Sequence, residues 1–100
     1  MNAVSKVSDI TVSDVWDYLH PSEPQMDADE RNTLNTMLDV AKTFIKNYTG
    51  QSDLDTQQDF VTVVFVLCQD MYDNRTLYVD SSNLSYVVQT ILGMHSVNLL

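Results

Sequence analysis

The chain has 100 residues, of which 14 are Asp or Glu and 5 are Lys or Arg, giving a formal net charge of -9 at pH 7. A chain of this length buries one hydrophobic core, and its excess of carboxylates repels phosphate, which argues against direct nucleic-acid binding. Only two Gly and two Pro are present, too few for the many tight turns of an all-β fold. We therefore expect a single helical domain over residues 1–100, of the all-α class.

The N-terminal segment, residues 1–9, has no apolar stretch of the kind that a secretory signal peptide requires. We expect this segment to be a flexible N-terminus. A short first helix is predicted at residues 12–19, because Thr11 and Asp14 have the spacing of a capping box. Pro21 follows and ends this helix.

A long second helix is predicted to begin at Asp27, with Glu30 in its first turn, and to end at Gly50. Gly50 is expected to adopt the left-handed conformation that closes many helices. Apolar residues recur at intervals of three and four, which predicts one buried face made of Leu34, Met37, Leu38, Ala41, Phe44, Ile45 and Tyr48.

The third predicted helix, at residues 56–74, contains the apolar run DFVTVVFVLCQDMYDNR. Its polar residues recur at intervals of three, four and seven, which favours a helix over a strand, and the run is too short to span a membrane. We expect Asp55 to cap its start together with Gln58, and Asn74 to end it. A helix that is apolar over most of its circumference is typical of the centre of a bundle. The expected core residues on it are Phe60, Val64, Leu67, Cys68 and Met71.

A loop at 76–83, with room for one short strand, is expected to lead to a fourth helix at 84–92 that Gly93 ends. Its inward residues are expected to be Leu84, Val87, Val88, Ile91 and Leu92. The remaining tail, residues 95–100, is apolar, and we expect it to bind a partner, the alternative being that it packs on its own domain. The predicted partner-binding residues are Val97, Asn98, Leu99 and Leu100.

Residues that could carry catalysis are few and scattered along the chain. His20 and His95 have no nucleophile or carboxylate at a characteristic spacing, and Cys68 lies inside an apolar run that disfavours a thiolate. As the single cysteine, Cys68 favours a reducing, intracellular origin. The sequence also lacks a Cys/His cluster, an EF-hand loop and a Gly-rich phosphate loop. We therefore expect no catalytic residues, no metal, no cofactor and no enzymatic activity.

Three segments in order carry a resemblance to a known family. They are ITVSDVWDYL, LDVAKTFIKNYTG, and MYDNR at the end of the apolar run. Together they resemble the small head-to-tail connector, or adaptor, proteins of long-tailed bacteriophages, over about residues 10–92. The motif residues here are Tyr48, Gly50, Tyr72, Asn74 and Arg75. The chain departs from the family pattern after the last of them, where TLYVDSSNLSYVV contains no glycine, and its tail lacks a basic terminus.

The resemblance implies a small bundle of about four helices, with one central apolar helix, that assembles as a ring beneath the portal and joins the head to the tail. The implied partners are other copies of the chain, usually twelve in a ring, the portal protein and the next neck or tail protein, with no membrane and no direct nucleic-acid binding. The implied location is the virion, and the host cytoplasm during assembly. Composition leaves open an alternative, a small acidic intracellular regulatory or inhibitory module that binds another protein.

Overall fold

The computed structural model describes residues 4–20 and 26–96, and within these ranges the chain is helical, with no strand. The described α-helices are α1 (Val12–Leu19), α2 (Ala28–Thr49), α3 (Asp59–Asn74) and α4 (Tyr86–Met94). Within the described residues there are also three short 3-10 helices: η1 (Val7–Asp9) precedes α1, η2 (Leu54–Thr56) precedes α3, and η3 (Ser81–Asn83) precedes α4. The predicted all-α class and the bundle of about four helices are confirmed.

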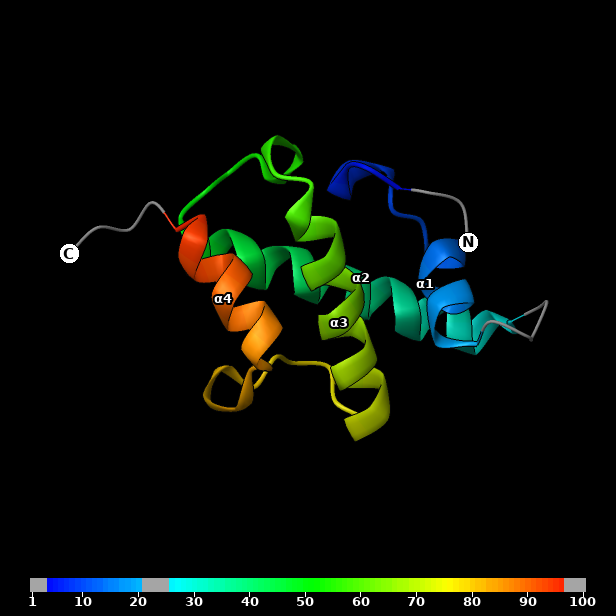
Figure 1. The fold of residues 1–100 in the computed structure, drawn as a ribbon. Helices are drawn as coiled ribbons and strands as arrows, with labels where there is room; N and C mark the ends of the chain where they lie inside the picture. The colour runs from blue at the N-terminus through cyan, green and yellow to red at the C-terminus, as the bar shows by residue number, and fades with distance from the viewer. Residues whose placement is uncertain (1–3, 21–25, 97–100) are drawn as a thin grey trace.

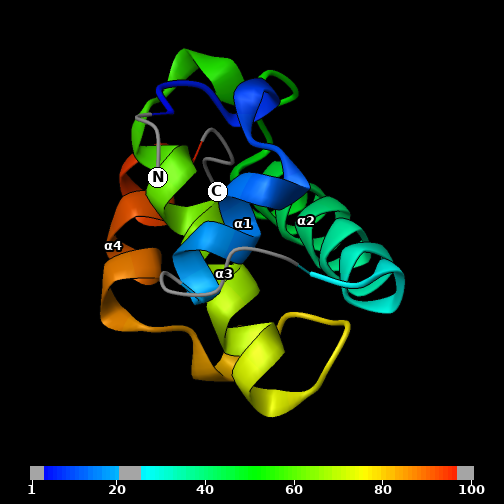
Figure 2. The ribbon, with the colours of Figure 1, turned by 90° about the vertical axis from the view of Figure 1, so that its right-hand side faces the viewer.

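Helix α3 lies at the centre of the bundle. Figure 1 shows α3 crossing in front of α2, with α1 on one side of it and α4 on the other. The side view of Figure 2 again places α3 between α2 and α4. Helix α3 contacts each of the other three helices, so its apolar surface is covered from several directions.

Burial explains why a valine-rich segment is helical here. All five residues expected in the core are buried, and the buried side chains of α3 are Phe60, Val61, Val63, Val64, Phe65, Leu67, Cys68 and Met71. Burying a Val, Leu or Phe side chain stabilises the fold by about 1.5–3 kcal/mol, whereas valine lowers helix propensity by at most about 0.7 kcal/mol. Tertiary packing therefore outweighs the local preference of these residues for a strand.

The predicted ends of the first two helices are confirmed. The Oγ1 atom of Thr11 accepts a hydrogen bond from the backbone of Asp14 at 3.1 Å, and Oδ2 of Asp14 accepts from the backbone of Thr11 at 2.9 Å. The carboxylate of Asp27 accepts from the backbone of Glu30 at 2.7 Å. Gly50 has φ 76°, the left-handed conformation expected after a helix.

The predicted start of α3 is wrong by three residues. The helix begins at Asp59 rather than at residue 56, and its N-cap, Gln58, makes no side-chain capping bond. Asp55 does not cap α3, because its carboxylate accepts two hydrogen bonds from Ser8. The residues before α3 instead form η2, whose Leu54 is buried.

The end of α3 is as predicted, whereas one residue near the end of α2 is not. Asn74 is the last residue of α3, and Arg75 after it adopts the left-handed conformation with φ 57°. Tyr48 is not on the buried face of α2, because 40% of it is exposed. Thr49 is buried instead, and its hydroxyl donates to the backbone oxygen of Ile45 at 2.7 Å, which satisfies the hydroxyl inside the core.

Helix α4 begins and ends later than expected. Ser85 caps its start by accepting from the backbone of Val88, and Gly93 lies inside the helix rather than ending it. Val87 faces outward and is 51% exposed, against the prediction that it faces the core. The connection before it contains η3 and no strand.

Of the N-terminal segment expected to be flexible, the structure describes residues 4–9. This part packs on the domain, because Val7 is buried and η1 contacts both η2 and α3. The residues therefore add to the core next to the start of α3.

Candidate functional site

Three helix ends meet around Tyr72, near the end of α3. His20 follows the last residue of α1, and its Nε2 lies 2.9 Å from the hydroxyl of Tyr72. The same hydroxyl donates to Oε2 of Glu30, in the first turn of α2, at 3.4 Å. We call this group, with Trp16 and Arg75, the Tyr72 junction.

Aromatic contacts orient the groups of the Tyr72 junction. The rings of Trp16 and His20, one helical turn apart, have centroids 4.2 Å apart. The His20 and Tyr72 rings form a T-shaped pair with centroids 5.3 Å apart, an arrangement that aromatic pairs favour. The guanidinium carbon of Arg75 lies 5.6 Å from the centre of the Tyr72 ring. The half-buried Tyr72 is thus contacted from the ends of α1, α2 and its own helix.

A groove of about 350 Å³ adjoins the Tyr72 junction, between the start of α2 and the end of α3. Its lining includes three carboxylates, those of Asp27, Asp29 and Glu30, and one guanidinium, that of Arg75. The other lining residues are Thr33, Met37, Tyr72, Thr76 and Leu77. The groove therefore combines an acidic rim with apolar side chains.

The chemistry that these residues can perform is limited by their protonation and pairing. Burial raises the pKa of the Cys68 thiol to about 12, so it is protonated at neutral pH. Burial, and after it the charge of Asp73, raises the pKa of Asp70. Within residues 4–20 and 26–96, no three His, Cys, Asp or Glu side chains are placed to hold a metal ion, and every buried polar side-chain atom has a hydrogen-bond partner.

The described part of the chain also contains no helix of sufficient length and apolarity to cross a membrane.

The structure separates the predicted motif residues into two groups. Tyr48 and Gly50 lie at the end of α2, whereas Tyr72, Asn74 and Arg75 lie at the end of α3, which contacts the start of α2 through Glu30. Because a helix rises 1.5 Å per residue, the two ends of α2 are roughly 30 Å apart. The motif therefore forms two separate helix ends rather than one site.

Each motif residue has a local role in the structure. The ring centroids of Tyr48 and Phe44 are 5.6 Å apart on α2. The side-chain amide of Asn74 donates to the backbone oxygen of Asp70 at 2.9 Å. The backbone nitrogen of Gly50 donates to the oxygen of Lys46 at 2.9 Å, which satisfies the end of α2.

The contribution of Trp16, His20 and Glu30 to the Tyr72 junction is not evident from the sequence. There, His20 has the features of a structural or solvated histidine, and Glu30 those of a helix start. Tyr72 is 52 residues from His20 and 42 from Glu30 along the chain. No local spacing could have indicated these contacts, because they depend on how the helices pack.

The start of the predicted partner-binding tail contacts its own domain. Nε2 of His95 lies 3.3 Å from Oδ2 of Asp59, and the centroids of the His95 and Phe60 rings are 5.4 Å apart. The side chain of Gln51 donates to the backbone oxygen of His95. The four residues predicted to bind a partner, Val97, Asn98, Leu99 and Leu100, lie outside the described residues.

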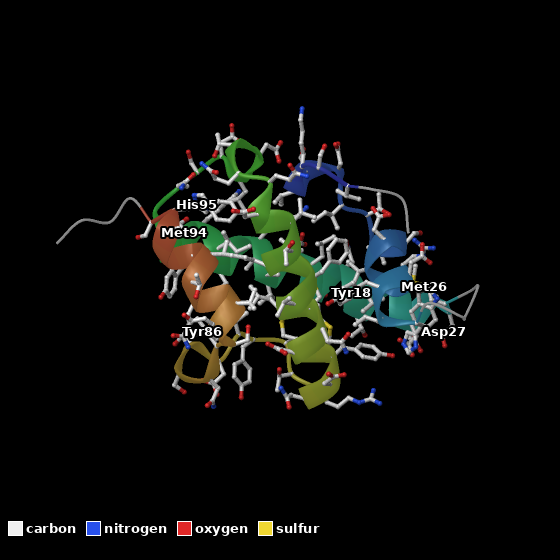
Figure 3. All side chains as sticks on the ribbon, in the orientation of Figure 1. Tyr18, Met26, Asp27, Tyr86, Met94 and His95 are labelled. Atoms are coloured by element: carbon white, nitrogen blue, oxygen red, sulfur yellow. The ribbon has the colours of Figure 1, made fainter. Side chains whose placement is uncertain are left out.

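A second candidate surface is the solvent-facing side of α4. Tyr86 is 82% exposed, Met94 64% and Val87 51%, and Thr90 and Gly93 are exposed between them. We call these five residues the α4 outer face. Figure 3 shows Tyr86 and Met94 near the two ends of α4, on the other side of α3 from Tyr18 and Asp27. Large apolar side chains gathered on one exposed helix face make it a candidate interaction surface.

Comparison with models of protein families, with curated protein sequences and with solved structures gave no match. A function for this chain must therefore be inferred from its own motifs, its internal contacts and the chemistry of its surface.

Proposed function

We propose that this chain is a subunit of a bacteriophage head-to-tail connector, a structural protein of the virion that assembles as a ring beneath the portal. The observation that carries the proposal is the ordered pair of motifs, IKNYTG at the end of α2 and MYDNR at the end of α3, within a small helical domain. The proposed partners are other copies of the chain, the portal protein and the next neck or tail protein. No catalytic step is part of this function.

The geometry of the Tyr72 junction supports a structural role. The ends of α1, α2 and α3 are linked through the ring and hydroxyl of Tyr72, so movement of one end requires a change at the other two. Such a link between three helix ends suits a subunit whose proposed role is to hold head and tail together. The exposed apolar residues between 77 and 94, which are Leu77, Tyr78, Tyr86, Val87 and Met94, provide surface for contacts with neighbouring chains.

The net charge of -9 is consistent with a channel through which DNA passes. A lumen that bound phosphate would retain the DNA, whereas an acidic one repels it. We expect no measurable binding to duplex DNA at low salt, where phosphate contacts are strongest. Micromolar affinity that weakens steeply as salt rises would contradict this part of the proposal.

The direct test uses the purified chain and portal rings from the genome that encodes it. We expect the two to sediment together in analytical ultracentrifugation, and electron microscopy to show an added ring on the tail-facing side of the portal. A chain that neither sediments with the portal nor changes its image would overturn the proposed function. Portal particles from an unrelated phage are the matched control.

The second candidate function, an acidic module that binds and regulates another protein, is favoured by the groove beside the Tyr72 junction. Its three carboxylates and apolar side chains suit a basic segment with long side chains. Glu30 lies in that groove and also accepts from Tyr72, so Asp29→Asn is the cleaner test variant. Capture of a basic repressor-like partner, lost at high salt and weakened by Asp29→Asn, would favour this function over the connector.

A further inference from the structure

The charged residues of the chain are distributed unevenly. All Asp, Glu, Lys and Arg residues lie in the first 80 positions, and residues 81–100 contain none. Helix α4 falls within this uncharged part, and its buried residues, Val88 and Leu92, face the core. The exposed α4 outer face is therefore uncharged on a molecule whose net charge is -9.

This distribution of charge favours some partners of the α4 outer face over others. Two copies that approach through acidic surfaces repel each other, and at distances below about 10 Å this repulsion is only partly screened by salt. If one of the two surfaces is uncharged, the repulsion at the contact is smaller, although the net charge of -9 on each copy still opposes association, and the burial of apolar area can stabilise the contact. A basic partner would instead be attracted to the acidic surface elsewhere.

We propose that the α4 outer face is the surface through which the chain binds a second copy of itself. Tyr86, Thr90 and Met94 are spaced by four residues and form one line along the helix, with Val87 and Gly93 beside it. Aromatic and methionine side chains are enriched at the centre of protein interfaces. The inference rests on the proposed function, because a ring requires contacts between copies, and it names one of the two surfaces in such a contact.

Gly93 adds a steric feature to this surface. A Cβ atom at position 93 would meet nothing within 4 Å, so the packing of the domain itself does not require a glycine there. A glycine on an exposed helix face leaves room for the backbone of another chain to approach closely. The second copy would therefore pack against the last turn of α4.

The size of the surface indicates a weak contact between two isolated copies. A nine-residue helix is roughly 13 Å long, and its one face is smaller than the roughly 800 Å² per partner of a standard stable interface. In a heterologous contact, the α4 outer face of one copy meets a different surface of the next, and repetition of that contact closes a ring. Because every copy in a closed ring is held by two neighbours, the weak contacts stabilise one another.

The test is the concentration dependence of sedimentation of the purified full chain, at low and high salt, for the natural protein and three variants. Val87→Asp and Thr90→Asp place a carboxylate on the α4 outer face at exposed positions. Asn35→Asp adds the same charge at an exposed position of α2 and is the matched control. Melting curves establish that all variants are folded.

We expect the natural protein to self-associate, more strongly at high salt because the repulsion between copies is screened. Val87→Asp and Thr90→Asp should weaken self-association by about tenfold or more, and Asn35→Asp by about twofold or less. Equal effects of all three variants, or no effect of the two α4 variants, would overturn the inference. A natural protein that stays monomeric at every concentration would overturn it as well. These sedimentation results do not test the proposed function, which depends on the separate experiment with portal rings.

A second measurement locates the contact directly. Cys68 is buried, so in Val87→Cys the new thiol is the one accessible to a maleimide reagent among the described residues. Its labelling should slow as protein concentration rises, whereas a thiol in Asn35→Cys should label at a constant rate. Equal labelling rates of the 87 thiol in monomeric and associated protein would contradict the inference.

Discussion

The hydroxyl of Ser8 donates to Oδ2 of Asp55 at 2.6 Å, and the backbone nitrogen of Ser8 donates to Oδ1 at 2.9 Å, which joins η1 to η2 across 47 residues. These two bonds are the main reason that the pKa of Asp55 lies below its usual value. They hold the N-terminal segment beside the start of α3. The link explains why Asp55 is not the cap of that helix.

Removal of the Ser8 side chain should make the free energy of unfolding vary less between neutral and acidic pH. A carboxylate with a depressed pKa stabilises the fold at pH values above its unfolded pKa, and this stability is lost as pH falls through its folded pKa. Ser8→Ala should therefore lower the free energy of unfolding at pH 7 and have less effect near pH 2. Urea denaturation of Ser8→Ala, Asp55→Asn and the double variant at both pH values measures the coupling. A coupling energy of the same size at both pH values would contradict the role of the carboxylate. Ser13→Ala removes the side chain of an exposed serine and is the control.

Asp70 should have the opposite effect on the pH dependence. Burial, with a smaller contribution from the charge of Asp73, raises the pKa of Asp70, so its ionised form disfavours the folded state. Asp70→Asn should raise the free energy of unfolding at pH 7, and the gain should vanish as pH falls below the unfolded pKa near 3.8. Asp17→Asn removes the same charge from an exposed position of α1 and controls for the change in net charge. A loss of stability at pH 7 in Asp70→Asn would contradict this prediction.

Truncation of Leu67 should destabilise the centre of the bundle. Leu67 is 1% exposed on α3, and removal of its side chain leaves a cavity, so Leu67→Ala should cost about 2–5 kcal/mol. Leu77→Ala is the matched control, because Leu77 is 53% exposed and the same change should cost about 0.5 kcal/mol or less. Chemical denaturation measures both values. A cost below about 1 kcal/mol for Leu67→Ala would mean that this side of α3 is not tightly packed.

Arg75 combines an unfavourable backbone conformation with a favourable side-chain contact. Its φ of 57° costs a non-glycine residue about 1–2 kcal/mol, whereas its position over the Tyr72 ring contributes about 0.5–1 kcal/mol. Both Arg75→Ala and Arg75→Gly lose the contact with the Tyr72 ring. Alanine keeps the unfavourable backbone conformation, whereas glycine adopts it without that cost. We expect Arg75→Gly to be more stable than Arg75→Ala by about 1 kcal/mol in urea denaturation.

Arg75→Lys tests whether the planar guanidinium matters. An ammonium group keeps the charge and loses the flat surface, so stability should fall between that of the natural protein and that of Arg75→Ala. For the preceding comparison, equal stability of Arg75→Ala and Arg75→Gly would show that residue 75 does not adopt the left-handed conformation in solution.

The two glycines should respond in opposite directions to the same change. Gly50 has φ 76° at the end of α2, so Gly50→Ala should cost about 1–2 kcal/mol. Gly93 lies inside α4 with open space around it, so Gly93→Ala should stabilise the monomer by up to about 1 kcal/mol. Thermal unfolding at a concentration where the protein is monomeric measures both. A loss of stability in both variants would place Gly93 at a helix end, as its sequence position suggests.

Short-range patterns in the sequence were sufficient to predict the helical class and those features that depend on neighbouring residues. The capping pair of Thr11 and Asp14, the left-handed Gly50 and the apolar run of α3 each depend on residues within a few positions of one another. The helical spacing of polar residues in that run was enough to predict a helix despite its many valines, and the same run contains the five predicted core residues that are buried.

Long-range contacts determined the remaining features. Asp55 has the spacing of a helix cap, but Ser8, brought near by the packing of η1 on η2, competes for its carboxylate. Leu84, which was expected inside the fourth helix, is buried before α4 begins, and Gly93, which was expected to end that helix, lies within it. The Tyr72 junction joins residues from three helices, and no spacing in one segment encodes their meeting. Hydrogen bonds and burial between distant segments have energies similar to those of local caps, so the folded arrangement selects which local preferences are kept.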